Sequence, residues 1–148
     1  MICDNCHSDL VLEDYLKCHC GNCNFTWFHT GNIKLVNLTP HALNIQTASG
    51  NVIDVAPSRL VARIATEKEL QFIQDDIEYF HMSVLGKPYM TDNEGKPLEQ
   101  SFPEQKDGTI YIVSGMFRQY FDREDLWQPG ELLRDDSGKI VGSRGLSR

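Results

Sequence analysis

Cysteines provide the strongest chemical signal in this chain, because all five fall within the first 23 residues. Two C-x2-C pairs are separated by 13 residues, and one further cysteine, Cys18, lies just before the second pair. Tight turns between paired cysteines direct four thiolates at one point, which is the tetrahedral geometry that Zn²⁺ takes in structural sites. The four predicted Zn²⁺ ligands are Cys3, Cys6, Cys20 and Cys23.

The same segment offers alternative ligands. Cys18 could supply a thiolate in place of Cys20, and His7 or His19 could supply an imidazole nitrogen. A redox role for either C-x2-C pair is disfavoured, since redox pairs of this type lie in a βαβ setting that is missing here. A site closed by four thiolates keeps no open position for water, so the predicted metal is structural.

A second set of polar residues, in the cysteine-free remainder, could form a ligand pocket. Ser114 follows a strongly apolar stretch, and Arg123 and Asp125 precede a Pro-Gly pair. If these segments meet, guanidinium and hydroxyl groups could hold a phosphate or carboxylate beside aromatic walls. The alternative is that Arg123 and Asp125 form a structural ion pair that braces a turn. The candidate ligand-binding residues are Arg63, Tyr111, Ser114, Arg123, Asp125, Arg134 and His41.

Catalysis has no positive signal in the sequence. The phosphate-binding, dinucleotide-binding, nucleophile-elbow and H-E-x-x-H motifs are all absent. His41 follows Pro40 and could orient a ligand or act as a general base, but the favoured interpretation is that its ring and the Thr39 hydroxyl satisfy backbone groups of a turn. The sequence therefore favours a binding protein over an enzyme. A nucleotide hydrolase that uses His41 ranks third, after the two binding hypotheses given at the end of this section.

Composition and charge exclude several classes of protein. The chain has 148 residues, of which 41% are hydrophobic and 24% charged, as expected for a soluble globular domain with a small appendage. A net charge of −7 without a basic stripe argues against binding to duplex DNA. The apolar runs are too short to span a bilayer, and no secretory signal is visible. We therefore expect a cytoplasmic protein, in which clustered cysteines bind metal rather than form disulfides.

The elements that must position these groups are predicted to be mainly strands. Residues 1–32 are expected to form a zinc ribbon, and residues 33–148 a compact, mainly antiparallel β domain with one or two short helices, which makes the fold class α+β. A capping-box pattern at Thr66 predicts helical turns over 67–74, and the apolar side of 114–121 predicts a second helix. The predicted strands of the main domain are 33–38, 42–46, 52–55, 60–64, 77–85, 109–113, 132–134 and 139–142.

Several sequence blocks occur in order along residues 33–146. They are V-N-L-T-P-H at 36–41, A-P-S at 56–58, G-T-I-Y-I-V-S at 108–114, R-E-D-L at 123–126 and G-K-I-V-G-S-R-G-L at 138–146. Together they resemble a family of small proteins, largely of unassigned function, from bacteriophages, prophages and their hosts. The resemblance implies an accessory protein that acts in the bacterial cytoplasm. The cysteine-rich extension departs from the family pattern, as does Ser143, where the family pattern has Cys.

Two binding hypotheses follow from these observations. The leading one is a non-enzymatic phage-type accessory protein that binds a nucleotide-like small molecule or a host factor, with sequestration of a defence signal as its anti-defence role. The alternative is a zinc-ribbon adaptor that contacts a host protein or single-stranded nucleic acid through Trp27, Phe28 and His29. A domain with exposed strand edges also often pairs with itself, so a homo-oligomer is expected.

Overall fold

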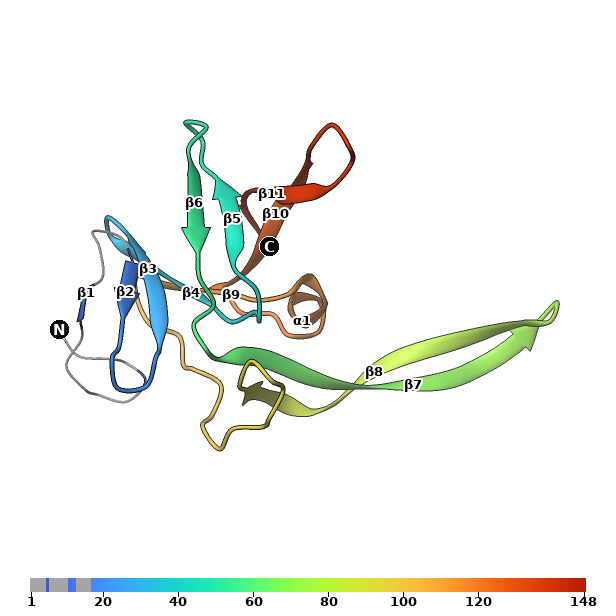
Figure 1. Cartoon of the computed structure of the whole chain (residues 1–148). Coiled ribbons are helices and arrows are strands. Elements are labelled where there is room, and N and C mark those ends of the chain that lie inside the picture. The colour runs from blue at the N-terminus through green and yellow to red at the C-terminus, as the bar shows by residue number, and fades with distance from the viewer. Residues whose placement is uncertain (1–4, 6–10, 13–16) are drawn as a thin grey trace.

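The structure, a computed structural model, describes residue 5, residues 11–12 and residues 17–148. In this part of the chain the fold is mainly β, as the sequence predicted. One curled mixed sheet is accompanied by a two-stranded antiparallel ribbon and a short helix (Figure 1). No helix among these residues is long and apolar enough to cross a membrane.

The curled sheet has nine strands within the described residues, in the order β1-β2-β3-β4-β9-β10-β11-β5-β6. Their bounds are β1 Val11–Leu12, β2 Lys17–His19, β3 Thr26–Thr30, β4 Ile33–Asn37, β5 Leu43–Gln46, β6 Val52–Val55, β9 Thr109–Ile112, β10 Leu126–Arg134 and β11 Ile140–Ser147. Three neighbouring pairs are parallel: β4–β9, β9–β10 and β11–β5. The other pairs are antiparallel, the arrangement that the sequence predicted to dominate.

Two apolar clusters hold the sheet together. The larger one packs Cys18, Cys20 and Trp27 of the N-terminal strands and turn against main-domain residues such as Leu38 and Phe117. The smaller one is built around Ile45, Val55 and Ile112. Strands β3 and β4 form a hairpin across the predicted boundary at residue 32, so the N-terminal strands share both a sheet and a core with the rest of the chain.

Asn37 fixes the point where the chain leaves β4. Its side chain is fully buried, and its Nδ2 donates to the carbonyl oxygens of His41 at 2.8 Å and Val55 at 3.1 Å. Its Oδ1 accepts from the backbone N of Thr39 at 2.9 Å. A buried amide with both ends bonded ties the β4–β5 turn to β6.

The two-stranded ribbon, which we call the arm, consists of β7 Val61–Gln74 and β8 Ile77–Thr91. It projects from the sheet as a long hairpin (Figure 1), and every residue from 67 to 82 is exposed to solvent. Its turn is formed by Asp75 and Asp76, whose φ angles of 53° and 65° match the left-handed pair that two-residue hairpins use. The base is anchored by Val61, Ala62 and Met90, which are buried.

The helix predicted over 67–74 is wrong, because these residues belong to β7. The capping-box pattern at Thr66 is present, but successive side chains alternate between two faces and pair across the arm with β8. The second predicted helix is confirmed as α1 Gly115–Tyr120, and the Oγ of Ser114 caps it by accepting from the Phe117 backbone N at 3.2 Å. The predicted hairpins at 42–55 and 132–142 are also present as β5–β6 and β10–β11.

Candidate functional site

Around α1, the candidate ligand-binding residues make structural contacts. Arg123 and Asp125 form a two-pronged ion pair, with Nε–Oδ1 at 2.6 Å and Nη2–Oδ2 at 2.8 Å. Asp125 is buried, and the guanidinium of Arg123 lies 5.2 Å from the centre of the Phe102 ring. With Ser114 capping α1, this geometry matches the ion-pair alternative rather than an open anion site.

The other candidates lie at separate places. Arg134 donates to the carbonyl of Gly138 at 2.8 Å, inside the β10–β11 turn. His41 lies in the β4–β5 turn, where its carbonyl accepts from Asn37 and from the Thr39 hydroxyl. Arg63, at the base of the arm, makes a long 3.5 Å hydrogen bond from Nε to the Oγ1 of Thr91.

Tyr111, the remaining candidate, is buried in the larger core cluster. None of the seven candidates lines the cavity of about 530 Å³ that the next paragraph describes. At the β10–β11 turn, hydrogen bonds from the Ser137 hydroxyl and from the backbone N–H groups of Lys139, Ser137 and Gly138 lower the pKa of the exposed Asp135 carboxyl. These bonds stabilise a turn and do not indicate a ligand.

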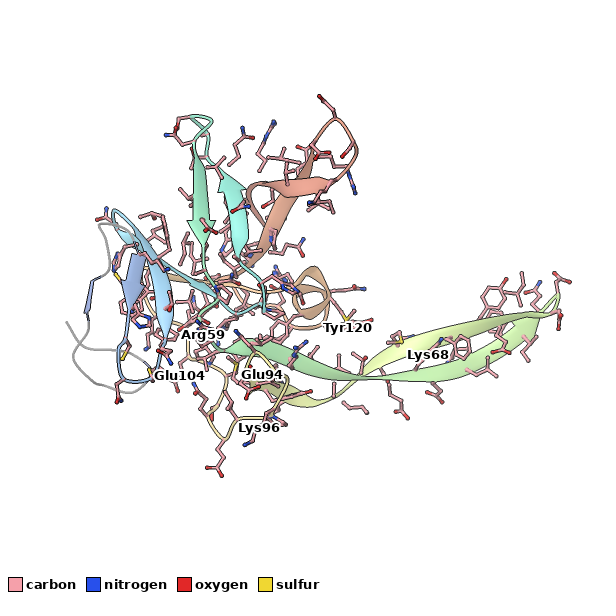
Figure 2. All side chains as sticks on the ribbon, in the orientation of Figure 1. Arg59, Lys68, Glu94, Lys96, Glu104 and Tyr120 are labelled. Atoms are coloured by element: carbon pink, nitrogen blue, oxygen red, sulfur yellow. The ribbon has the colours of Figure 1, made fainter. Side chains whose placement is uncertain are left out.

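A cavity of about 530 Å³ lies where three segments meet: the turn after β2, the link between β6 and β7, and the loop after β8. Its lining residues are mostly polar. They are Asn5, Cys23, Asn24, Phe25, Ser58, Arg59, Leu60, Asp92, Asn93, Glu94, Leu98 and Gln100. Figure 2 shows Arg59 and Glu94 in this region, at the base of the arm.

Arg59 is the only cation among the residues that line the cavity. Its backbone φ is 82°, a left-handed value that is uncommon for a residue with a side chain. Within the part of the chain that the structure describes, its guanidinium makes no hydrogen bond or ion pair. An unpaired guanidinium beside a cavity can bind a carboxylate, a phosphate or a carbonyl oxygen.

The loop after β8 supplies the opposite wall. Asp92 orders this loop, because its Oδ1 accepts from the backbone N of Glu94 at 3.0 Å and of Lys96 at 2.9 Å. The Oδ1 of Asn93 is buried and has no hydrogen-bond partner among the described residues. A buried acceptor without a partner is unfavourable, and this oxygen lies beneath the surface of the loop.

The Cys20–Cys23 turn forms the third wall. The backbone N of Asn24 donates to the Cys20 carbonyl at 2.9 Å, and Asn24 takes a left-handed φ of 61°. The side-chain amide of Asn5 donates to the Sγ of Cys23 at 3.4 Å, and Gln100 in turn donates to the Oδ1 of Asn5 at 3.1 Å. The residue between the first pair of cysteines in sequence therefore contacts the second pair.

Half of the predicted zinc site lies outside the described residues, namely Cys3 and Cys6, as does the alternative ligand His7. Among the residues that are described, no three His, Cys, Asp or Glu side chains converge as a metal-binding group. Cys18 pairs in register with Trp27 and is buried in the larger core cluster.

The adaptor hypothesis predicted that Trp27, Phe28 and His29 form an exposed stacking surface, and this prediction is wrong for the first two residues. Trp27 is 1% exposed and Phe28 is 7% exposed, so neither ring is available to stack on a base. His29, the third residue, is partly exposed on β3. Both buried rings contribute instead to the two core clusters.

The chain was compared with known proteins at three levels, and it matches no family model, no curated protein and no solved structure. The cavity residues Arg59 and Asn93 were not predicted from sequence. Only the turn-forming Asn93-Glu94-Gly95 run marked this loop as a place where the chain reverses.

Proposed function

We propose that this protein is a non-enzymatic accessory protein that binds one small polar molecule in the cavity beside Arg59. The unpaired Arg59 guanidinium is the observation that carries the proposal. The cavity's volume of about 530 Å³ supports it, since small-molecule sites usually measure about 300–1,000 Å³. Arg59 supplies donors, and Asp92 and Glu94 supply acceptors, so the ligand must offer both kinds of group.

Charge narrows the class of ligand. Asp92 and Glu94 line the same cavity as Arg59, so its wall carries two carboxylates against one guanidinium. Two carboxylates disfavour a polyphosphate, which would bring several negative charges next to them. We therefore restrict the nucleotide-like ligand expected from sequence to a nucleoside or a nucleoside monophosphate, with its base N–H edge toward the carboxylates of Asp92 and Glu94 and its anionic or carbonyl group toward Arg59.

The biological setting of the proposal comes from the resemblance to small phage and prophage proteins. A stoichiometric binder in the bacterial cytoplasm would act by sequestering its ligand, and removal of a nucleotide-derived signal would weaken a host defence. Such a protein needs affinity and abundance, but it needs no catalytic residues. This fits a chain without catalytic motifs.

Titration calorimetry tests the proposal directly. The probes are the four common ribonucleosides, their linear and cyclic monophosphates, and ATP as a contrast. We expect heat from at least one nucleoside or monophosphate and weaker binding of ATP. Arg59→Gln should weaken that binding roughly tenfold to hundredfold, the usual loss for a hydrogen bond to a charged group.

Lys96→Gln is the matched control, because it removes the same charge from the neighbouring loop but from a residue that does not line the cavity. Its affinity should equal that of the unmodified chain. The absence of binding heat for every ligand in the panel would refute the proposal. Equal losses of affinity from Arg59→Gln and Lys96→Gln would refute it as well. Release of a cleaved product during the titration would instead support the hydrolase hypothesis.

The proposal includes a structural Zn²⁺ held by Cys3, Cys6, Cys20 and Cys23. The hydrogen bond from the Asn5 amide to the Cys23 sulfur supports it, since metal-bound thiolates commonly accept such bonds from outer-shell groups. The left-handed Asn24 directly after Cys23 completes a tight turn of the kind that directs two thiolates to one side. Bound Zn²⁺ would cross-link the two C-x2-C pairs. It would thereby hold in place the cavity wall that Cys23 and Phe25 form.

A further inference from the structure

One face of the arm is mainly apolar, and no other element of the described structure covers it. Leu70, Ile73, Phe80, Met82 and Val84 are all 38–59% exposed. An isolated two-stranded ribbon is marginally stable in water, and exposed apolar patches usually mark interaction sites. This face therefore needs an external partner.

Register shows that these side chains share one face. Leu70 pairs across the strands with Phe80, and Lys68 pairs with Met82. We call each such cross-strand pair a rung, and these two rungs lie two residues apart on the same face of the arm. The Nζ of Lys68 lies 4.0 Å from the centre of the Phe80 ring, as expected for neighbours on one face. Figure 2 shows Lys68 on the arm, well away from the sheet.

The rest of the arm limits how a partner can approach. In its middle, the opposite face of the arm carries the polar, exposed Glu67, Glu69 and His81, and nearer the tip it carries the stacked rings of Phe72 and Tyr79, which are also exposed. The edges are interrupted by register shifts, one at Leu70/Phe72 and one at Arg63/Ala65. Bulged edges pair poorly with further strands. Contact through the apolar face is therefore favoured over extension of the sheet.

Two opposite charges lie within the apolar face, and their positions match those on a second copy of the arm. Lys68 lies on the base side of the Leu70–Phe80 rung, and Glu78, which pairs with Ile73, lies on the tip side. A second arm laid antiparallel over the first brings Lys68 of each copy beside Glu78 of the other. A parallel arrangement would instead set lysine against lysine and glutamate against glutamate.

We propose that the apolar face of the arm packs antiparallel against the same face of a second copy of this chain, to form a two-fold symmetric dimer. A second copy supplies an equal apolar stripe and both opposite charges, with the self-complementarity that a two-fold interface requires. The acidic middle of the opposite face remains in water.

Analytical ultracentrifugation of the full chain tests the dimer. We expect a dimer for the unmodified protein and a monomer for Phe80→Asp. Ser83→Asp is the matched control. Ser83 lies on the same strand as Phe80 but on the other face of the arm, where it pairs across the strands with Glu67. This variant should remain dimeric. Thermal unfolding should show that both variants keep the folded sheet, because Phe80 lies outside both core clusters.

A charge exchange tests the antiparallel arrangement without changing the apolar residues. Lys68→Glu and Glu78→Lys should each raise the dimer dissociation constant roughly tenfold, since two exposed ion pairs become two repulsions. The double variant should restore the original constant. A monomeric unmodified chain would overturn the proposal and assign the face to a different partner. A dimer that survives Phe80→Asp, or single exchanges that leave the dissociation constant unchanged, would overturn it as well.

Discussion

Arg59 combines an unusual backbone conformation with an unpaired charge. A residue with a side chain at a φ of 82° is strained, and strain of this kind often persists where a side chain must be held toward a ligand. Ser58 before it is fully buried and bonds to Leu60 through its hydroxyl, which holds the chain through this turn. The surrounding structure therefore imposes the conformation of Arg59.

Two substitutions at Arg59 separate backbone strain from the lost charge. Arg59→Gly and Arg59→Val both remove the guanidinium, but glycine accepts a left-handed φ and a β-branched residue resists it. We expect the glycine variant to be more stable than the valine variant by about 2 kcal/mol, as measured by denaturant unfolding. Both should lose ligand binding. Equal stabilities would show that the turn relaxes around either side chain.

Sequence analysis identified residues whose role follows from type and local spacing. Ser114 was placed at the start of a helix, and the pairing of Arg123 with Asp125 was recognised as an alternative to ligand binding. Arg59 and Asn93 could not be identified, because a left-handed φ and an unsatisfied buried oxygen arise from tertiary packing. Neither leaves a signal in residue type.

At the scale of elements, the local helix signal was correct over 114–121, where α1 lies, and wrong over 67–74, which belongs to β7. Residues 66–70 read Thr-Glu-Lys-Glu-Leu, which shows no alternation of apolar and polar residues and contains a hydroxyl-x-x-Glu pattern that resembles a helix start. Pairing with β8 across the Asp75-Asp76 turn decided the outcome. The exceptional length of the arm could not be foreseen, because exposed apolar residues read in sequence as core.

The β10–β11 pair depends on a close backbone approach at Gly130. A Cβ at this position would meet the Arg144 carbonyl oxygen at a separation of 2.1 Å, with a second carbonyl, from Gly145, at 3.0 Å. Gly130→Ala should therefore destabilise the protein by about 3 kcal/mol or more in denaturant unfolding. Gly115→Ala is the control, because its Cβ meets only the movable side chain of Gln128, at 3.0 Å. A Gly130 variant as stable as this control would contradict the strand register.

At the scale of the whole molecule, the N-terminal strands and the main domain share one sheet and one core. The predicted division at residue 32 followed a turn signal over 29–32, which separates the cysteine-rich segment, ending at Cys23, from the blocks of the family resemblance. Sequence could not indicate that Cys18, Cys20 and Trp27 would pack in the same cluster as Leu38 and Phe117. Loss of the proposed Zn²⁺ should therefore destabilise the shared sheet and core as well as the cysteine-rich segment.

Metal removal tests this coupling. Purified protein should contain about one Zn²⁺ per chain by elemental analysis, and a strong chelator should lower the midpoint of thermal unfolding for the whole protein. Cys23→Ser should lose the metal, whereas Cys18→Ala should keep it while losing some stability from the core. Retention of zinc by Cys23→Ser, or its loss from Cys18→Ala, would require a different ligand set.

The position of β11 inside the sheet has a consequence for how the chain acquires its structure. Ile45 of β5 pairs in parallel with Ser143 of β11, nearly a hundred positions further along. The β5–β6 hairpin therefore has no neighbour to join during synthesis until almost all of the described chain has been made. Contacts between such distant segments slow folding. We expect refolding on the slow side for a domain of this size, with insertion of β11 as the step that closes the sheet.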